Sequence, residues 1–453
     1  MQQALVWQSI QAYKIPILEI SLAVSLTLLS TLLRFPALLL HGLLTYIQPD
    51  NAPSQNGGVK AAIRRPSDGN AEPKPRKGKS KEKFEFDENQ AQIFRLKLDE
   101  GHLQSRLYFK DYWYSFTYSL ISLACLSLHK YLAAGEGGEE RDGGAFVNGS
   151  LIPAILILVG ILKLFVSLGK VSFERSASKR SEKRFGLVVG VLGFVLGFIV
   201  CSGFAGSVLD FDLNSLDGYG KFFIAFLMGC IGGFLYMAAG KNARSFWIGT
   251  DQTRSNLSII SCGGFAKMIL YGNYISVALP VLLWIRPLSE ILYKKDSGNA
   301  DQLVGRLGFA RSEFVNLRIW SLVASACFQL VAIRPNLQMF LNEAVLSWYQ
   351  RLHASRVPDL DFSRAKVFLH NHFLCLVGLQ FFAPPILVLL FLGLSLIDGN
   401  SVKNNMHMFC GLLPCSAFTK EVGVFMAWWV VFVWTVFTSI SLLFYRRGTL
   451  SVS

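Results

Sequence analysis

Residues 373–397 have the sequence FLCLVGLQFFAPPILVLLFLGLSLI and contain no charged side chain. An apolar stretch of this length is long enough for an α-helix to cross a hydrocarbon core of about 30 Å. The whole chain has the same character, because 52% of its 453 residues are hydrophobic and only 16% are charged. That composition is too apolar for an ordinary soluble chain, and it predicts a protein that spans a membrane.

Further apolar blocks occur on the N-terminal side of this stretch, and one more follows it. They cover residues 15–33, 112–131, 151–168, 185–207, 222–239, 268–285, 319–333 and 424–444. Blocks of roughly 18 to 22 apolar residues are typical of spanning helices. We therefore predict an all-α integral membrane protein, a polytopic helical bundle of about nine transmembrane helices.

The formal charge of +14 comes from Lys and Arg residues that lie in the gaps between the apolar blocks. A nucleic-acid-binding protein would instead gather them on one face of a folded domain, so the expected partner is the lipid bilayer and not nucleic acid. The basic residues are concentrated in segments that are cytosolic if the N-terminus is lumenal or outside. The C-terminus is then cytosolic. The endoplasmic reticulum, other endomembranes and the plasma membrane all remain open.

Four regions are expected along the chain. Residues 1–47 should form an N-terminal anchor span and then an interfacial helix at 35–47. Residues 48–89 should form a disordered basic cytosolic linker, because their composition buries too little apolar surface to offset the entropy of ordering. Residues 90–110 mix apolar and charged side chains, which predicts an amphipathic interfacial helix. Residues 111–453 should form a transmembrane helical bundle of about eight spans.

The basic linker has two features that suggest regulation. Its cations, from Lys74 to Lys83, could contact anionic lipid at about 1 kcal/mol per charge near the surface, or they could only set topology. Arg64, Arg65 and Pro66 precede Ser67, which makes Ser67 a candidate phosphosite. A phosphate there would add about −1.5 to −2 charge and weaken a lipid contact.

Four glycines in the block at 185–207 are spaced by four, three and four residues: Gly186, Gly190, Gly193 and Gly197. This spacing places them on one helix face, where they allow another backbone to approach closely. The seam could join two neighbouring helices of one protomer, join two protomers, or line a conduction path.

A few polar side chains lie inside the predicted spans and form a candidate intramembrane polar site: Lys163, Glu19, Gln329 and Gln380. Lys163 is the most informative, because an ammonium within a span normally faces a partner or water. Snorkelling toward the interface and a role in a pore or lipid site are both open for it.

Neither a catalytic site nor a cofactor or metal site is indicated. The sequence contains no CxxC pair, HExxH, GxSxG or P-loop, so familiar routes to redox, hydrolytic and phosphoryl-transfer chemistry lack support. We expect a protein that is not an enzyme. Cys410 and Cys415 lie in the last predicted outer loop, where they could form a disulfide or remain two free thiols.

Several short strings, taken in order, resemble the transmembrane protein 161 family. They are ILKLF at 161–165, the Leu-Pro and Trp-containing residues at 279–287, RIW at 318–320, AIRPNLQ at 332–338, LQF with Pro384 at 379–384, and Trp428 with Trp429. The resemblance implies a multi-pass membrane protein of unestablished biochemical activity, with links to stress responses and membrane excitability. It supplies no catalytic residues.

The combined interpretation is a non-enzymatic structural or regulatory membrane protein that acts through membrane-protein partners. The alternative is an ion channel or transporter that conducts through the helical bundle. A continuous polar path across the bundle would favour the alternative.

Overall fold

The computed structural model describes residues 13–47, 93–135, 151–174, 180–211, 213, 218–251, 262–292, 311–353, 360–397 and 417–450. The linker at 48–89 with Ser67, and the pair Cys410 and Cys415, lie outside these residues. The described helices are α2 (Lys14–Leu33), α3 (Phe35–Leu38), α4 (Glu100–Gln104), α5 (Phe109–Gly135), α6 (Leu151–Phe173), α7 (Arg180–Cys201), η2 (Phe204–Ser207), α8 (Gly218–Thr250), α10 (Gly264–Leu283), α11 (Arg286–Leu292), α12 (Arg311–Leu352), α13 (Leu360–His372), α14 (Leu374–Ser395) and α17 (Ala417–Arg446). The strands are β1 (Leu44–Ile47) and β2 (Phe94–Lys97).

Eight of the described helices are long and apolar enough to cross a membrane: α2, α6, α7, α8, α10, α12, α14 and α17. The chain is therefore a multi-pass helical membrane protein. The ninth block predicted from the sequence, 112–131, lies within α5 but is not among these eight. The hydroxyl groups of α5 make it less apolar, although it packs against α2, α6 and α14.

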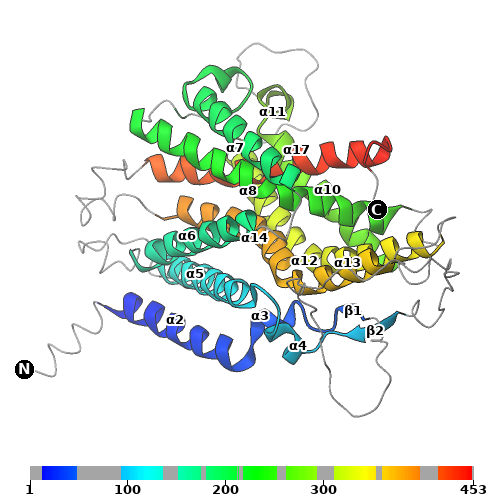
Figure 1. Cartoon of the computed structure of the whole chain (residues 1–453). Helices are drawn as coiled ribbons and strands as arrows, with labels where there is room; N and C mark the ends of the chain where they lie inside the picture. The colour runs from blue at the N-terminus through cyan, green and yellow to red at the C-terminus, as the bar shows by residue number, and fades with distance from the viewer. Residues whose placement is uncertain are drawn as a thin grey trace, which may run out of the picture.

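Helix α14 occupies the middle of the bundle (Figure 1), where it packs against α5, α6, α12 and α17. Of its most apolar 18-residue window, 94% is buried. A helix that is apolar on all faces is stable only when other helices cover it on every side, unless it faces lipid alone. The uncharged stretch at 373–397 therefore also lies at the centre of the core.

The four predicted glycines of α7 face α8. A Cβ added at Gly193 would lie 3.1 Å from the Met228 carbonyl oxygen, and one added at Gly197 would lie 2.8 Å from the Ala225 Cα. Small residues on both helices let the backbones approach this closely. Within the described residues, the seam therefore joins neighbouring helices of one chain.

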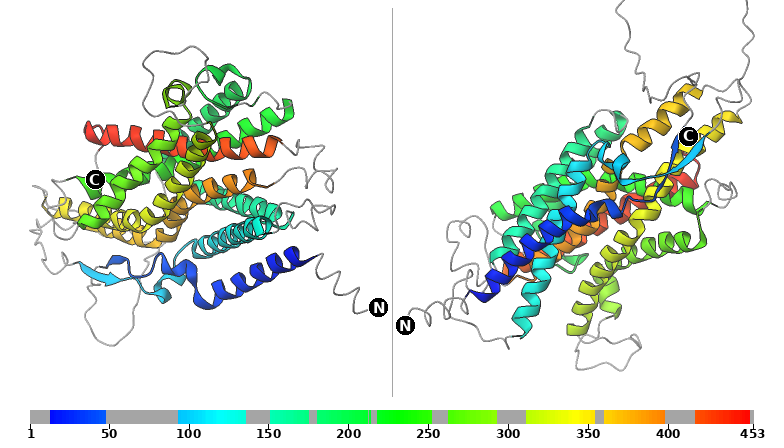
Figure 2. Two further views of the ribbon diagram at one scale, coloured as in Figure 1. Left: turned by 180° about the vertical axis from the view of Figure 1, so that it is seen from behind. Right: turned by 90° about the horizontal axis from the view of Figure 1, so that it is seen from below.

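The segments 35–47 and 90–110 differ from the predicted interfacial helices. After the four-residue α3, residues 44–47 form β1, which pairs antiparallel with β2 in the register Leu44↔Lys97 to Ile47↔Phe94. Helix α4 covers only Glu100–Gln104. We call the strand pair the ribbon, and the end of the bundle where it lies the ribbon end. In the left view of Figure 2, which shows the molecule from behind, α12 and α13 also extend to the ribbon end.

The helix prediction was wrong here because the partners of these residues are distant in sequence. The Gln338 side chain of α12 accepts a hydrogen bond from the Leu44 amide at 2.9 Å and donates one to the Leu44 carbonyl at 3.2 Å. Asn371 of α13 donates to the Tyr46 carbonyl at 2.8 Å. These side-chain amides form hydrogen bonds with the backbone groups on the open edge of β1, as a neighbouring strand would. The extended conformation is therefore stable here.

Candidate functional site

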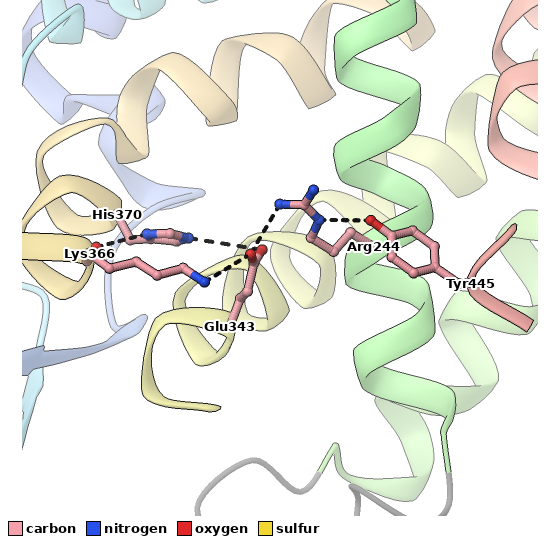
Figure 3. A network of polar contacts seen from close by, with 5 residues as sticks. All are labelled: Arg244, Glu343, Lys366, His370 and Tyr445. Atoms are coloured by element: carbon pink, nitrogen blue, oxygen red, sulfur yellow. Dashed lines mark hydrogen bonds and ion pairs between the residues drawn. The ribbon is translucent and has the colours of Figure 1, made fainter. Parts of the chain in front are cut away.

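A polar network joins four helices at the ribbon end (Figure 3). Its centre is Glu343 of α12, whose Oε1 lies 3.1 Å from Nη1 of Arg244 on α8 and 3.5 Å from Nζ of Lys366 on α13. Arg244 also donates from Nε to the hydroxyl of Tyr445 on α17, at 2.9 Å. Helices α8 and α13 therefore meet α12 at one carboxylate, and α17 joins them through Arg244.

The carboxylate of this network is almost fully buried. The Glu343 side chain is 4% exposed, while those of Arg244 and Lys366 are 34% and 13% exposed. An isolated buried charge is costly, so the two cations stabilise the carboxylate and the carboxylate stabilises them. Removing the central acid would leave two cations close together, which makes Glu343 the residue on which the network depends.

His370 of α13 is a further member of this network (Figure 3). Its Nδ1 lies 2.8 Å from the Lys366 carbonyl oxygen, which can only accept, so Nδ1 is the donor. Its Nε2 faces Oε2 of Glu343 at 3.9 Å, and its ring stacks on Phe340 with centroids 4.5 Å apart. The His370 ring therefore contacts α12 through both Phe340 and the Glu343 carboxylate.

Gln380, one of the predicted intramembrane polar residues, is paired inside the bundle. Its Oε1 accepts a hydrogen bond from Lys241 of α8 at 2.8 Å, and its side chain is buried within α14. Lys241 is thus a second ammonium inside the bundle, and it lies two residues beyond the apolar block predicted at 222–239. It lies one helical turn before Arg244, so α8 brings two cations to the same region.

A small cavity lies between α8, α10, α12 and α17. Among its lining residues are Asn242, Asn273, Asn336 and Thr438. Asn273 Oδ1, Asn336 Oδ1 and Thr438 Oγ1 are buried and have no hydrogen-bond partner among the described residues. The cavity has room for about one water-sized molecule, which can satisfy about three polar groups at once.

Gln329 lies on α12 seven residues before Asn336, close to the same helix face. Both atoms of its amide are buried without a hydrogen-bond partner in the described residues. The predicted polar residue therefore extends the polar side of α12 beyond the cavity, although it does not line the cavity itself.

Lys163 and Glu19 occupy separate places. Lys163 of α6 lies 4.0 Å from the Asp111 carboxylate of α5, so it has a partner of opposite charge. Glu19 of α2 is fully buried and lies 3.0 Å from Nδ1 of His129 on α5. The four predicted polar residues thus belong to different contacts and do not form one site.

Sequence reasoning missed Glu343 and Arg244. The apolar block at 319–333 ends before Arg334 and Pro335, so the following residues were assigned to a cytosolic segment. Helix α12 instead continues through Pro335 to Leu352. A signal was present, because residues 339–348 are apolar apart from Asn342, Glu343 and Ser347, which is a composition typical of a buried segment.

Comparison with known proteins gives one family. The family model described as predicted transmembrane protein 161AB matches residues 218–403, which include α8, α10, α12, α13 and α14. This match confirms the resemblance found in the sequence, and it covers both Arg244 and Glu343. No solved structure matches the chain.

Proposed function

Taking the chain as a member of the transmembrane protein 161 family, we propose that it is a non-enzymatic regulatory membrane protein that acts through other membrane proteins. The observation that carries this proposal is the network around Glu343. Its charges are turned toward one another and join α8, α12, α13 and α17. A rigid end of this kind, with the ribbon docked on it, suits a surface that holds a partner in one geometry.

The apolar part of α8 that precedes Lys241 supports the same proposal. On α8 the side chains of Ile224, Met228, Ile231 and Leu235 are all at most 1% exposed. Polar residues of this helix that face the interior begin only at Lys241 and Asn242. A conduit needs polar groups along its whole length, so a tightly packed apolar part favours a closed bundle.

A channel or transporter remains the second candidate function. The cavity with the unpartnered oxygens of Asn273, Asn336 and Thr438 favours it, since such atoms suit a passing ion or water. The buried ammonium of Lys241 is the kind of group that marks a substrate or proton path. Both features lie toward the ribbon end of the bundle.

We further propose nine spans, with α5 as the ninth, an outer or lumenal N-terminus and a cytosolic C-terminus. The 27 residues of α5 are long enough to cross a membrane. Several of its hydroxyls bond to backbone carbonyls or to hydroxyls of adjacent helices, for example Ser115 to Ser167 at 3.1 Å. Such bonds lower the cost of polar groups in lipid. This topology places the ribbon end in the cytosolic leaflet of an endomembrane or the plasma membrane.

Flux through liposomes tests the proposal directly. The purified full chain is reconstituted into vesicles loaded with dyes for protons, K⁺, Na⁺, Ca²⁺ and chloride. We expect no flux above protein-free vesicles. In native membranes, cross-linking should retain the chain in a larger complex, and Glu343→Gln should reduce that complex. Flux that scales with protein and falls in Asn336→Leu would support the channel or transporter and overturn the regulatory role.

A further inference from the structure

The seam between α5 and α6 carries an excess of positive charge at the ribbon end. Asp111 of α5 lies 2.9 Å from the ammonium of Lys170 and 4.0 Å from that of Lys163, both on α6. The two lysines are seven residues apart, so their side chains extend toward one another to reach the same carboxylate. These three side chains together carry one positive charge; the nearby Glu174 carboxylate, just after α6, accepts a hydrogen bond from the Tyr108 hydroxyl.

Lys163 has a charge partner but, among the described residues, no hydrogen-bond acceptor. A distance of 4.0 Å to Asp111 is too long for a hydrogen bond, and its other contact is the Tyr114 ring, 5.5 Å from Nζ to the centroid. No other acceptor in the described residues bonds to this ammonium. Its side chain is 25% exposed, so part of it is accessible from outside the bundle. An ammonium within a span needs acceptors, and here they must come from outside the bundle.

The surroundings of Lys163 face lipid. On α6, Leu162 and Val166 are 65% and 48% exposed, and on α5 Tyr114 and Tyr118 are also exposed. Exposed apolar residues on a spanning helix contact acyl chains, and tyrosines are enriched at the level of the headgroups. The exposed part of the Lys163 side chain therefore lies where acyl chains meet headgroups, within reach of a lipid phosphate.

We propose that Lys163 and Lys170 bind the headgroup of an anionic phospholipid at the ribbon end of the α5–α6 seam. The phosphate oxygens supply the acceptors that Lys163 lacks, and the excess positive charge favours an anionic headgroup over a zwitterionic one. Asp111 holds the two ammonium groups together and limits the charge of the site. The site does not rest on the proposed function, because a regulatory protein and a channel could both carry it.

The experiment measures binding of fluorescent phosphatidylserine to the delipidated full chain in detergent, with fluorescent phosphatidylcholine as the zwitterionic reference. Lys163→Gln and Lys170→Gln should each lower the preference for phosphatidylserine about fivefold, as expected for about one basic contact near a membrane surface. Asp111→Asn should raise it by up to about fivefold. Lys221→Gln is the matched control, since this lysine lies at the start of α8, at the opposite end of the bundle. It should leave the preference unchanged.

All variants share the same basic segments elsewhere in the chain, so differences between them report the substituted side chain. Lys163→Arg keeps the charge and should keep the preference, which separates lipid binding from a general loss of folding. An unchanged preference in both Lys163→Gln and Lys170→Gln would overturn the proposal and leave simple snorkelling. Displacement of phosphatidylserine by millimolar inorganic phosphate would also overturn it, because the site would then take a soluble anion.

Discussion

Replacing Gly229 of α8 with alanine should loosen the packing of α7 on α8. A Cβ at this position would lie 2.8 Å from the Gly190 carbonyl oxygen and 3.1 Å from the Phe194 Cβ. The first contact is with backbone, so no side-chain rotation can relieve it. The two helices would have to separate by about 0.6 Å to reach an ordinary contact of 3.4 Å.

Gly232, one helical turn further along α8, provides the matched control. A Cβ there would lie 3.4 Å from the Val189 carbonyl oxygen, which is ordinary contact. Both substitutions gain the same helix propensity, so the difference between them isolates the clash. Because overpacking typically costs about 1–3 kcal/mol, we expect Gly229→Ala to be less stable than Gly232→Ala by that amount.

Thiol labelling combined with thermal unfolding provides the assay. Cys201 on α7 is 1% exposed, so it reacts only when α7 moves away from its neighbours. Its labelling rate, followed by peptide mapping of the purified full chain, should rise in Gly229→Ala and stay at the wild-type level in Gly232→Ala. Equal melting temperatures and equal labelling in the two variants would refute the argument from close backbone approach.

Three further outcomes are expected. Glu343→Gln should destabilise the bundle by about 3 kcal/mol in thermal unfolding, because it removes the buried carboxylate that Arg244 and Lys366 share. Glu290→Gln, at an exposed ion pair, should change stability by less than about 1 kcal/mol, and equal effects of the two substitutions would contradict the role of burial. Gln338→Ala should speed hydrogen exchange in β1 while leaving α14 unchanged, and unaltered exchange would show that the side-chain amide does not hold the ribbon. A C-terminal tag should be cleaved by external protease in intact, correctly oriented microsomes, and its protection would contradict the nine-span topology.

Spanning helices could be predicted from the sequence. The apolar blocks at 151–168 and 222–239 lie within α6 and α8, and the block at 373–397 includes all of α14, because insertion into lipid depends on local composition and length. The glycine spacing of α7 likewise identified a close-packing face, since a helix places residues three and four apart on one side. Its partner helix could not be predicted in this way.

The tertiary structure alone decided which distant groups meet. Glu343 gains its cations from α8 and α13, and Leu44 gains its hydrogen bonds from Gln338, 294 residues later in the chain. Local sequence left Glu343 outside the predicted apolar blocks and predicted an interfacial helix around Leu44. A buried charge and an isolated strand are both unfavourable until a long-range partner satisfies them, and only the packed bundle brings that partner within reach.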